Sequence, residues 1–337
     1  MNAEAHDDHL TRRKFLKRSA KAATAAAAAC LVGYRFHDRS GPTGEPVPAP
    51  DRHIPNFAIP GHPPRIAVSH GGDRVGNFHR AIEALGGLEH FITSGDRVLL
   101  KVNAAFAAPP LLGATTHPEL VAEVARLCFK LGAAAVFVTD NPINDPVSCF
   151  ELTGIAEAAR GVGAQLLLPR EDYFSAVSVD GGRLIRRWPV LYAPVSRVNK
   201  LIGLATVKDH HRSGASLVMK NWYGLLGGRR NIFHQDIHTI ITELAMMVQP
   251  TLVVLDGTVS MMTNGPTGGS LSDLKPSETM IVGTDQVAVD ALGATLLDRT
   301  ADSLPFIAMA EKAGVGSRTA EILDIRSDGN DRAGASG

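Results

Sequence analysis

Cysteine is scarce in this chain, and its few cysteines lie far apart. The 337 residues include three, at positions 30, 128 and 149, and no Cys-x-x-Cys pair occurs. A four-thiolate zinc site and a self-contained iron–sulfur cluster both need closely spaced thiolates, so the sequence excludes both. Cys128 follows Val121 and Val124 at helical spacing, which predicts a small buried hydrophobe. A disulfide between Cys128 and Cys149 is the alternative in an exported protein.

Other familiar signatures are also missing. Lys plus Arg equals Asp plus Glu at 34 each, so no excess charge indicates a nucleic acid, and we expect none as a partner. Aromatic residues make up only 5%, so the core must be built mainly from Val, Leu, Ile and Ala, which favours a layered α/β protein. The absence of Gly-x-Gly-x-x-Gly, Gly-Lys-Ser/Thr and Gly-x-Ser-x-Gly argues against a standard dinucleotide fold, a P-loop and an ordinary serine hydrolase.

The N-terminal segment differs from the rest of the chain. Two arginines, at 12 and 13, stand before a short, weakly hydrophobic, Ala-rich run. A basic head before such a run is typical of a secretory signal and is too short for a comfortable transmembrane helix. The order Thr-Arg-Arg-Lys-Phe-Leu-Lys resembles the twin-arginine export signal, so we predict a signal peptide over 1–34 and periplasmic export by the twin-arginine machinery. Lipidation at Cys30, cleavage and an uncleaved membrane anchor all stay open.

The remainder is expected to form one domain. A Pro/Gly-rich linker covers 35–64, the domain 65–320, and a flexible tail 321–337. Strands and helices alternate at βαβ spacing, which predicts an α/β fold with a mostly parallel sheet and helices on both faces, a Rossmann-like three-layer arrangement. The stretch "AVSVDGGRLIRRWPV" predicts an inserted β-hairpin. The strands that surround the expected site are 97–103, 134–140, 199–208 and 251–257.

Two helix starts are predicted near the candidate site. Thr116, with Glu119 three residues later, has the spacing of a capping box. Ser213 or Gly214 would begin a second helix that carries Lys220 and Asn221.

Polar side chains follow five of the predicted strands. Ligands bind open parallel sheets at the carboxyl ends of their strands, so we expect these side chains to meet in one cavity. Because loops are generally polar, coincidence is the alternative. Lys101 lies within an otherwise buried run, where it is either the ion-pair partner of an aspartate or a binder of the substrate anion. The residues at the five strand ends are Lys101 and Asn103, Asp140, Lys208 and His210, Asp256, and Thr284 with Asp285.

The catalytic candidates are His210, Lys208 and Lys220. Histidine titrates near neutral pH, so His210 is the expected acid/base. The two lysines, together with Lys101, would bind a small anionic ligand, while the next residue, His211, is expected to face solvent. The remaining candidate ligand-binding residues are Asn103, Thr116, Asn221, Asn264 and Gly265.

A divalent metal is a candidate cofactor. His234 and His238 have the i, i+4 spacing of paired ligands, although Asp236 resembles a helix N-cap and would leave His234 outside the helix. The candidate metal ligands are His234, Asp256 and Asp285. Asp285 immediately precedes a predicted helix, so its alternative role is an N-cap. If both aspartates belong to the site, Asp285 lies at the mouth of that helix and Asp290 supports it from beneath.

Several of these segments together resemble a known family. "VLLKVN", "LVMKNWYGLLGG", "LDGTVSMMTNGPTGG" and "GTDQVAVDALGATLL" stand in the order typical of the domain-of-unknown-function 362 family, over about residues 65–316. Members are often associated with iron–sulfur proteins, and many carry a ferredoxin-like cysteine-rich segment, which this chain lacks. The architecture is also distantly similar to the nickel-dependent lactate racemase superfamily, whose sites combine His and Lys.

Three functional hypotheses follow. The first is an exported enzyme that acts on a small anionic substrate with a metal or organic cofactor, either in redox chemistry with a separate partner protein or in isomerisation or racemisation. The second is a non-catalytic periplasmic carrier of a metal or cofactor that uses the same cavity. The third is an assembly factor that acts through its surface.

Overall fold

The computed structural model describes residues 12–36, 51–61 and 63–325, and the chain divides into two units, 1–49 and 50–337. The described part of the first unit is one helix, α1 (Arg12–Phe36), and the side chains of residues 12–35 are exposed. None of the described helices combines the length and the apolar character needed to cross a membrane. Residues 37–50 and 62 of the expected linker lie outside the described part.

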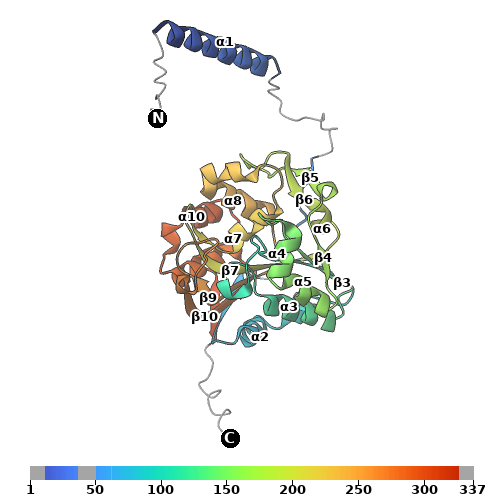
Figure 1. Cartoon of the computed structure of the whole chain (residues 1–337). Coiled ribbons are helices and arrows are strands. Elements are labelled where there is room, and N and C mark those ends of the chain that lie inside the picture. Colours follow the sequence, from blue (N-terminus) through green and yellow to red (C-terminus); the bar gives the residue numbers. More distant parts are fainter. Residues whose placement is uncertain (1–11, 37–50, 62, 326–337) are drawn as a thin grey trace, which may run out of the picture. The chain divides into compact units, whose positions relative to one another are not determined.

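The second unit is organised around a mixed sheet of nine strands (Figure 1). The order is β11-β1-β10-β9-β7-β2-β3-β4, with β8 paired to the end of β7. The pairings give β10 and β8 one direction and the other seven strands the opposite one, which confirms the predicted mostly parallel sheet. The bounds are β1 Arg65–His70, β2 Arg97–Lys101, β3 Ala135–Thr139, β4 Gln165–Leu167, β7 Lys200–His210, β8 Gly214–Ser216, β9 Leu252–Met261, β10 Leu274–Gly283 and β11 Glu321–Ile325.

Helices cover both faces of this sheet, as the sequence predicts. In β2, Leu99 packs into one hydrophobic cluster while Val98 and Leu100 pack into the other, because successive side chains of a strand point to opposite faces. One face carries α2 (Arg74–Ala84), α3 (Pro118–Lys130), α4 (Pro146–Leu152) and α5 (Ile155–Gly161). The other carries α7 (Val218–Asn221), α8 (Ile237–Met247), α9 (Gln286–Gly293) and α10 (Pro305–Lys312). Burial on both faces explains why the central strands are almost continuously apolar.

The predicted hairpin is present as a separate two-stranded sheet. β5 (Phe174–Val177) pairs antiparallel with β6 (Trp188–Leu191), and the short helix α6 (Tyr192–Val195) follows. The expected turn is made within the connection, where the amide of Gly182 donates to the carbonyl oxygen of Val179 at 2.9 Å.

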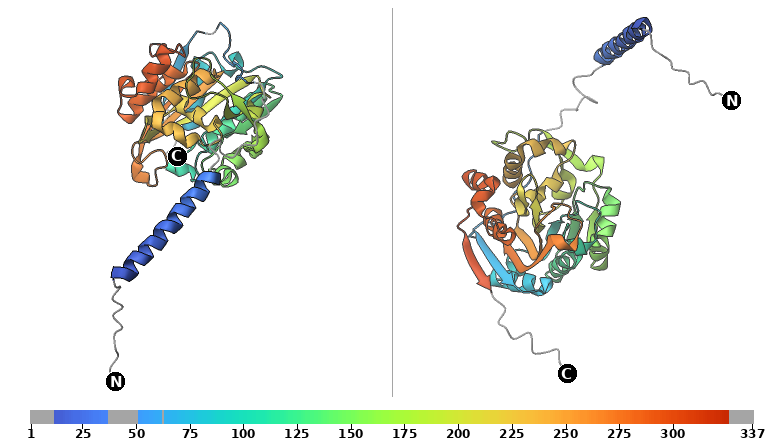
Figure 2. Two further views of the ribbon diagram at one scale, coloured as in Figure 1. Left: turned by 90° about the horizontal axis from the view of Figure 1, so that it is seen from above. Right: turned by 60° about the vertical axis from the view of Figure 1, so that its left-hand side comes forward.

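Three local predictions are wrong. The helix after β2 begins at Pro118 behind His117, not behind Thr116, because tertiary contacts take the hydroxyl that a cap would need. The residues after β7 form β8, not a helix, since Gly214 adopts a left-handed φ of +80° that turns the chain back on β7. In the expected flexible tail, residues 321–325 form β11, which pairs with β1 at the edge of the sheet (Figure 2). The two described cysteines of this unit, Cys128 and Cys149, are buried and free.

Candidate functional site

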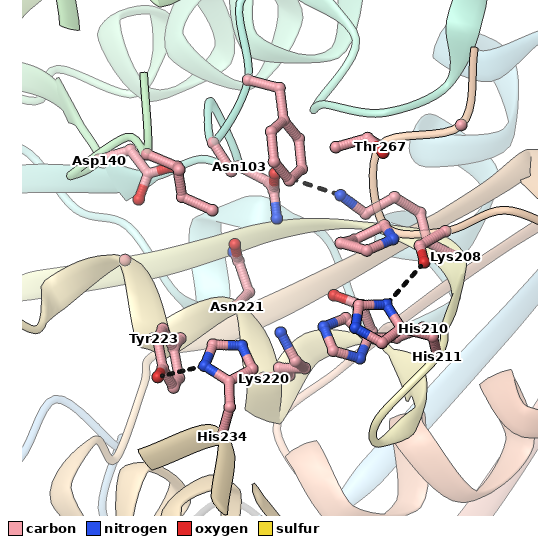
Figure 3. Close-up of a pocket in the computed structure, with 18 of the residues that line it drawn as sticks. Asn103, Asp140, Lys208, His210, His211, Lys220, Asn221, Tyr223, His234 and Thr267 are labelled. Atoms are coloured by element: carbon pink, nitrogen blue, oxygen red, sulfur yellow. Dashed lines mark hydrogen bonds between the residues drawn. The ribbon is translucent and has the colours of Figure 1, made fainter. Parts of the chain in front are cut away.

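A cavity of about 750 Å³ lies at the carboxyl ends of the parallel strands (Figure 3). Asn103, Asp140, His210 and Asn264 stand at or just beyond the ends of β2, β3, β7 and β9 respectively, and all four line it. Three of the five strand ends singled out from the sequence, those of β2, β3 and β7, therefore converge, and Asn264 joins them from the loop after β9. The volume lies in the range of sites that enclose organic ligands.

The floor beneath the cavity is a buried ion pair. Lys101 Nζ lies 2.8 Å from Asp140 Oδ1, and both side chains are inaccessible to solvent. Lys101 also donates to the carbonyl oxygens of Val102 and Asn221, so the first of its two predicted roles, partner of an aspartate, is the one the structure shows. A Cβ on Gly224 would lie 1.8 Å from Asp140 Oδ1, so glycine is required where the backbone covers this pair.

Lys208 is the more deeply buried of the two predicted catalytic lysines. Its Nζ donates to the carbonyl oxygen of Ala114 at 2.5 Å and to Asn103 Oδ1 at 3.4 Å, and it lies 5.6 Å from the centre of the Phe106 ring. None of these neighbours carries charge. Burial, reinforced by the charge of Lys220, lowers the pKa of Lys208 to about 7, so this amine gains and loses a proton near neutral pH.

Lys220 lies in the cavity without a counter-ion. It forms neither a hydrogen bond nor an ion pair with the described residues, and its Nζ lies 5.3 Å from the centre of the Tyr223 ring. Burial, followed by the charge of Arg230, lowers the pKa of Lys220 to about 8. An ammonium group without an acceptor at the wall of a cavity is a binding group for an anion.

The position of Lys220 depends on a carboxylate from another helix. α7 is a single turn, and both oxygens of Asp290 in α9 accept its first amides, from Val218 at 2.7 Å and Met219 at 3.0 Å. Asp290 thus supports Lys220, not Asp285 as expected. The neighbouring Asn221 donates from Nδ2 to the carbonyl oxygens of Lys101 and Leu204, so it holds α7 against β2 and β7 while lining the cavity.

His210 is held in one tautomer by its own loop. The backbone amides of Arg212 and Ser213 both donate to its Nδ1 at 3.2 Å, so this nitrogen is unprotonated and the neutral ring carries its proton on Nε2. Burial first, then the charge of Lys220, lowers the pKa of His210 to about 2. The ring therefore stays neutral at physiological pH. It offers the cavity a hydrogen-bond donor and not the proton acceptor that the sequence suggested.

His234 is held in the opposite tautomer. Its Nδ1 lies 3.2 Å from the carbonyl oxygen of Asn231, which only accepts, so Nδ1 carries the proton. The same nitrogen lies 3.1 Å from the Tyr223 hydroxyl, which donates in turn to the carbonyl oxygen of Arg230. The lone pair of His234 is therefore on Nε2. Figure 3 shows this ring between Tyr223 and Lys220.

The two histidines lie close together with complementary hydrogen-bonding groups. Their ring centres are 6.1 Å apart and the planes are inclined by 17°. One ring presents an N–H at Nε2, and the other presents a lone pair at the same position of the ring. A donor and an acceptor are thereby fixed beside the unpaired Lys220, without a charge on either imidazole.

A loop after β9 covers one side of these rings. Asn264 and Gly265, both predicted to contact a ligand, lie in the cavity wall. Asn264 Nδ2 donates to Asp273 at 2.6 Å, and a Cβ on Gly265 would lie 1.9 Å from the carbonyl oxygen of Asp209. His211 was expected to face solvent, but it also lines the cavity, stacks 5.0 Å from His210 and lies 3.4 Å from the carbonyl oxygen of Gly265.

The predicted metal ligands do not come together. Asp285 follows the carboxyl end of β10. Because β10 runs antiparallel to β9, this end lies beside the amino ends of the parallel strands, on the side of the sheet away from the cavity. Asp285 caps α9 by accepting from Val287 and Ala288, which is its alternative predicted role. Asp256 lies inside β9, which is longer than predicted, and it binds Arg74 at 2.6 Å outside the cavity. In the part of the chain that the structure describes, no group of three His, Cys, Asp or Glu residues is arranged to hold a metal ion.

Two predicted ligand-binding residues, Lys101 and Thr116, are structural, and several cavity residues were missed. The Thr116 hydroxyl accepts from the amide of Asn103 and donates to the carbonyl oxygen of Leu204, and it does not line the cavity. Arg230, which no motif marked, donates to four backbone carbonyl groups and ties the loop after β3 to the segment after α7. The other cavity residues that sequence reasoning did not select include Phe106, Asn141, Ile143, Tyr223 and Thr267.

Together these features define a mixed α/β protein with a cationic cavity, containing histidine and lysine, at the carboxyl edge of its sheet. The sequence profile of the family described as "Domain of unknown function (DUF362)" matches residues 98–295, which is more than half of the chain and includes every cavity residue. The chain belongs to this family.

Two further similarities were found. The "Thylakoid-associated protein sll1697" of Synechocystis sp. is 25% identical over 260 residues, covering 74% of this chain and 78% of the relative. Among solved structures, the lactate racemase apoprotein from Thermoanaerobacterium thermosaccharolyticum aligns with a TM-score of 0.33 and 11% identity, covering 60% of this chain. That alignment spans about half, 52%, of the racemase chain.

Proposed function

We propose that this protein is an enzyme that binds an organic anion in the cavity and transfers a proton there. The observation that carries the proposal is the pair of neutral histidines with opposite tautomers beside an ammonium group that lacks a partner. An acceptor for the proton, a donor for an oxygen that gains charge and a cation for the anionic group of a substrate are the three elements that enolisation next to a carbonyl group requires.

Each of the three residues has one role in this proposal. Lys220 binds the anionic group, since it has no competing acceptor among the described residues. His234 accepts the proton from carbon at Nε2, while Tyr223 and Asn231 hold its other nitrogen. His210 donates from Nε2 to the substrate oxygen on which negative charge develops. A neutral imidazole is suited to this last role because it does not have to give up its proton.

Burial lowers the pKa of Lys208 to about 7, so its amine changes charge near neutral pH. We propose that it returns the proton to the product or holds a second anionic group of the substrate. Isomerisation and racemisation are the reaction classes that this arrangement favours. A redox version, with an organic cofactor or a separate partner protein, would use the same cavity, and absorbance spectra of protein purified before export test it.

The test uses the full-length protein and 2-oxo acids in D₂O. We expect 2-oxobutanoate to exchange its C3 protons for deuterium faster than in buffer alone, as followed by proton NMR. His234→Gln should abolish the exchange and His210→Gln should slow it about 10²- to 10³-fold, with binding retained in both. Lys220→Met should weaken binding instead. If a panel of 2-oxo acids binds without any exchange, the non-catalytic carrier replaces the enzyme.

We also propose that the chain is exported by the twin-arginine route, with residues 1–34 as the signal. The paired arginines at the start of an Ala-rich helix support this proposal. Replacing Arg12 and Arg13 together by lysine should retain the protein in the cytoplasm of a host with this pathway. An unchanged periplasmic fraction would refute the proposal. Attachment to the membrane after export is measured in the same fractionation.

A further inference from the structure

We infer that the ligand of this cavity is an amphiphilic organic anion, with one anionic group at Lys220 and an apolar portion of several carbon atoms. The inference rests on the proposed function only in taking Lys220 as the group that binds the anion. It adds the chemical class of the remainder of the ligand, which the histidines and lysines do not determine.

The size of the cavity exceeds what a small hydrophilic anion needs. A water molecule takes about 30 Å³ of liquid volume, whereas the cavity measures about 750 Å³. Cavities in this range enclose most of the surface of a drug-sized ligand. An anion of two or three carbons would leave most of the space to water.

The charged groups occupy only part of the wall. Asp140 is the one acidic residue among those lining the cavity, and its charge is already balanced by Lys101. Lys208 hydrogen-bonds only to uncharged acceptors, and Lys220 has no acceptor among the described residues. Arg230 also lines the cavity, but its guanidinium is taken up by four backbone carbonyl groups. The ammonium groups left to meet an anion therefore come from neighbouring positions on β7 and α7, which suits one anionic group and not a ligand with charge along its length.

Another part of the wall is apolar. The amide of Ile143 donates to the carbonyl oxygen of Ala105 at 2.9 Å, which joins the loop after β2 to the loop after β3. Ala105, Phe106 and Ile143 from these two loops line the cavity, and so does Pro266 from the loop after β9. Apolar side chains of this kind stabilise a ligand mainly by removing its apolar portion from water.

Exposed apolar side chains gather on the same loops. Ile143 is 65% exposed although it belongs to the cavity wall. Leu111 lies in the loop after β2, beyond the lining residue Phe106, while Ile232 lies between Arg230 and His234, and Leu271 just beyond Gly268. Large apolar side chains that remain exposed around a cavity mark a binding surface more often than those scattered singly. The apolar portion of a ligand that extends toward the opening would meet them.

The experiment measures binding of straight-chain carboxylates, from acetate to decanoate, to the full-length protein by calorimetry. We expect affinity to rise about three- to four-fold per methylene group until the cavity is filled. Primary alcohols of the same lengths should bind more weakly but with a similar rise. Lys220→Met should lower the affinity of each carboxylate toward that of its alcohol, whereas Ile143→Ser should reduce the gain in affinity per methylene group.

Leu152→Ser is the matched control, because Leu152 is also exposed and apolar but lies outside the cavity. This substitution should leave the affinity of each carboxylate, and its rise with chain length, unchanged. A monomeric short-chain phosphatidate in the same assay distinguishes a phosphate head group from a carboxylate, and either supports the inference if affinity rises with chain length. Acetate binding as tightly as octanoate, with dependence on Lys220, would overturn the inference and leave the anion site intact. Binding neither of the carboxylates nor of the phosphatidate would overturn the inference and the proposed function together.

Discussion

Binding of an organic anion at pH 8 should draw protons into the protein. Burial holds the pKa of Lys208 at about 7 and that of Lys220 at about 8. At pH 8 about one-tenth of Lys208 and half of Lys220 are therefore charged. A bound anion favours the ammonium form of both. If it raises both pKa values above 10, the protein takes up about 0.9 proton at Lys208 and about 0.5 at Lys220, or about 1.4 in all.

Calorimetry measures this uptake directly. The heat of octanoate binding is recorded in Tris and in triethanolamine, two amine buffers that do not compete as anions. The dependence of that heat on the ionisation enthalpy of the buffer gives the number of protons. Lys220→Met should lower the uptake to about 0.9 and Lys208→Met to about 0.5. At pH 6 both lysines are already charged, so the uptake should nearly vanish.

One result would refute this reasoning. If octanoate binds at pH 8 with an uptake below about 0.2 proton, both lysines are charged before binding or neither meets the anion. The pH dependence of folding stability should also reflect the depressed pKa of Lys208. The folded-state pKa of Lys208 lies below its ordinary value, so the stability that this group contributes is present at alkaline pH and is lost as the pH falls toward 7.

The remaining predictions concern the groups that support the site. Asp290→Ala leaves two buried amides of α7 without an acceptor, so the free energy of unfolding measured in urea should fall by about 2–3 kcal/mol. A decrease below about 0.5 kcal/mol would show that Asp290 does not stabilise α7. Gly224→Ala forces a Cβ onto Asp140 and should cost at least about 3 kcal/mol, while Gly161→Ala, with open space around it, should be nearly neutral. The depressed pKa of His210 means that stability is lost as the pH falls from its ordinary value near 6.5 toward 2. Between pH 7 and pH 5 the free energy of unfolding of the wild type should fall by about 2 kcal/mol more than that of His210→Gln. If NMR shows that the His210 ring becomes protonated near pH 6, this prediction is wrong.

Local sequence patterns were sufficient for the strands that build the site. Runs such as 199–208 are apolar throughout because both faces of the sheet are covered, and this made the ends of β2, β3 and β7 recognisable. The polar residues that follow those runs do meet in one cavity.

The errors concern properties that no local pattern contains. Asp285 follows its strand as Asp140 does, but the direction of β10 is set by its pairing with β1 and β9, so the two aspartates lie at opposite edges. Thr116 has the spacing of a cap, yet bonds to β2 and β7 take its hydroxyl. The roles of His210 and His234 follow from which nitrogen meets an amide or a carbonyl oxygen, and only the folded loops decide that.

A helix of one turn is not stable by itself, because forming the first turn restricts the backbone of several residues and gains only one hydrogen bond. α7 has four residues, and its first amides are bonded to a side chain seventy positions away in the sequence. The geometry of the cavity is therefore encoded partly in α9, which contributes no lining residue to it. Substitutions along α9 would therefore change which ligands bind, although α9 does not touch them. Mutagenesis limited to the cavity wall would miss these positions.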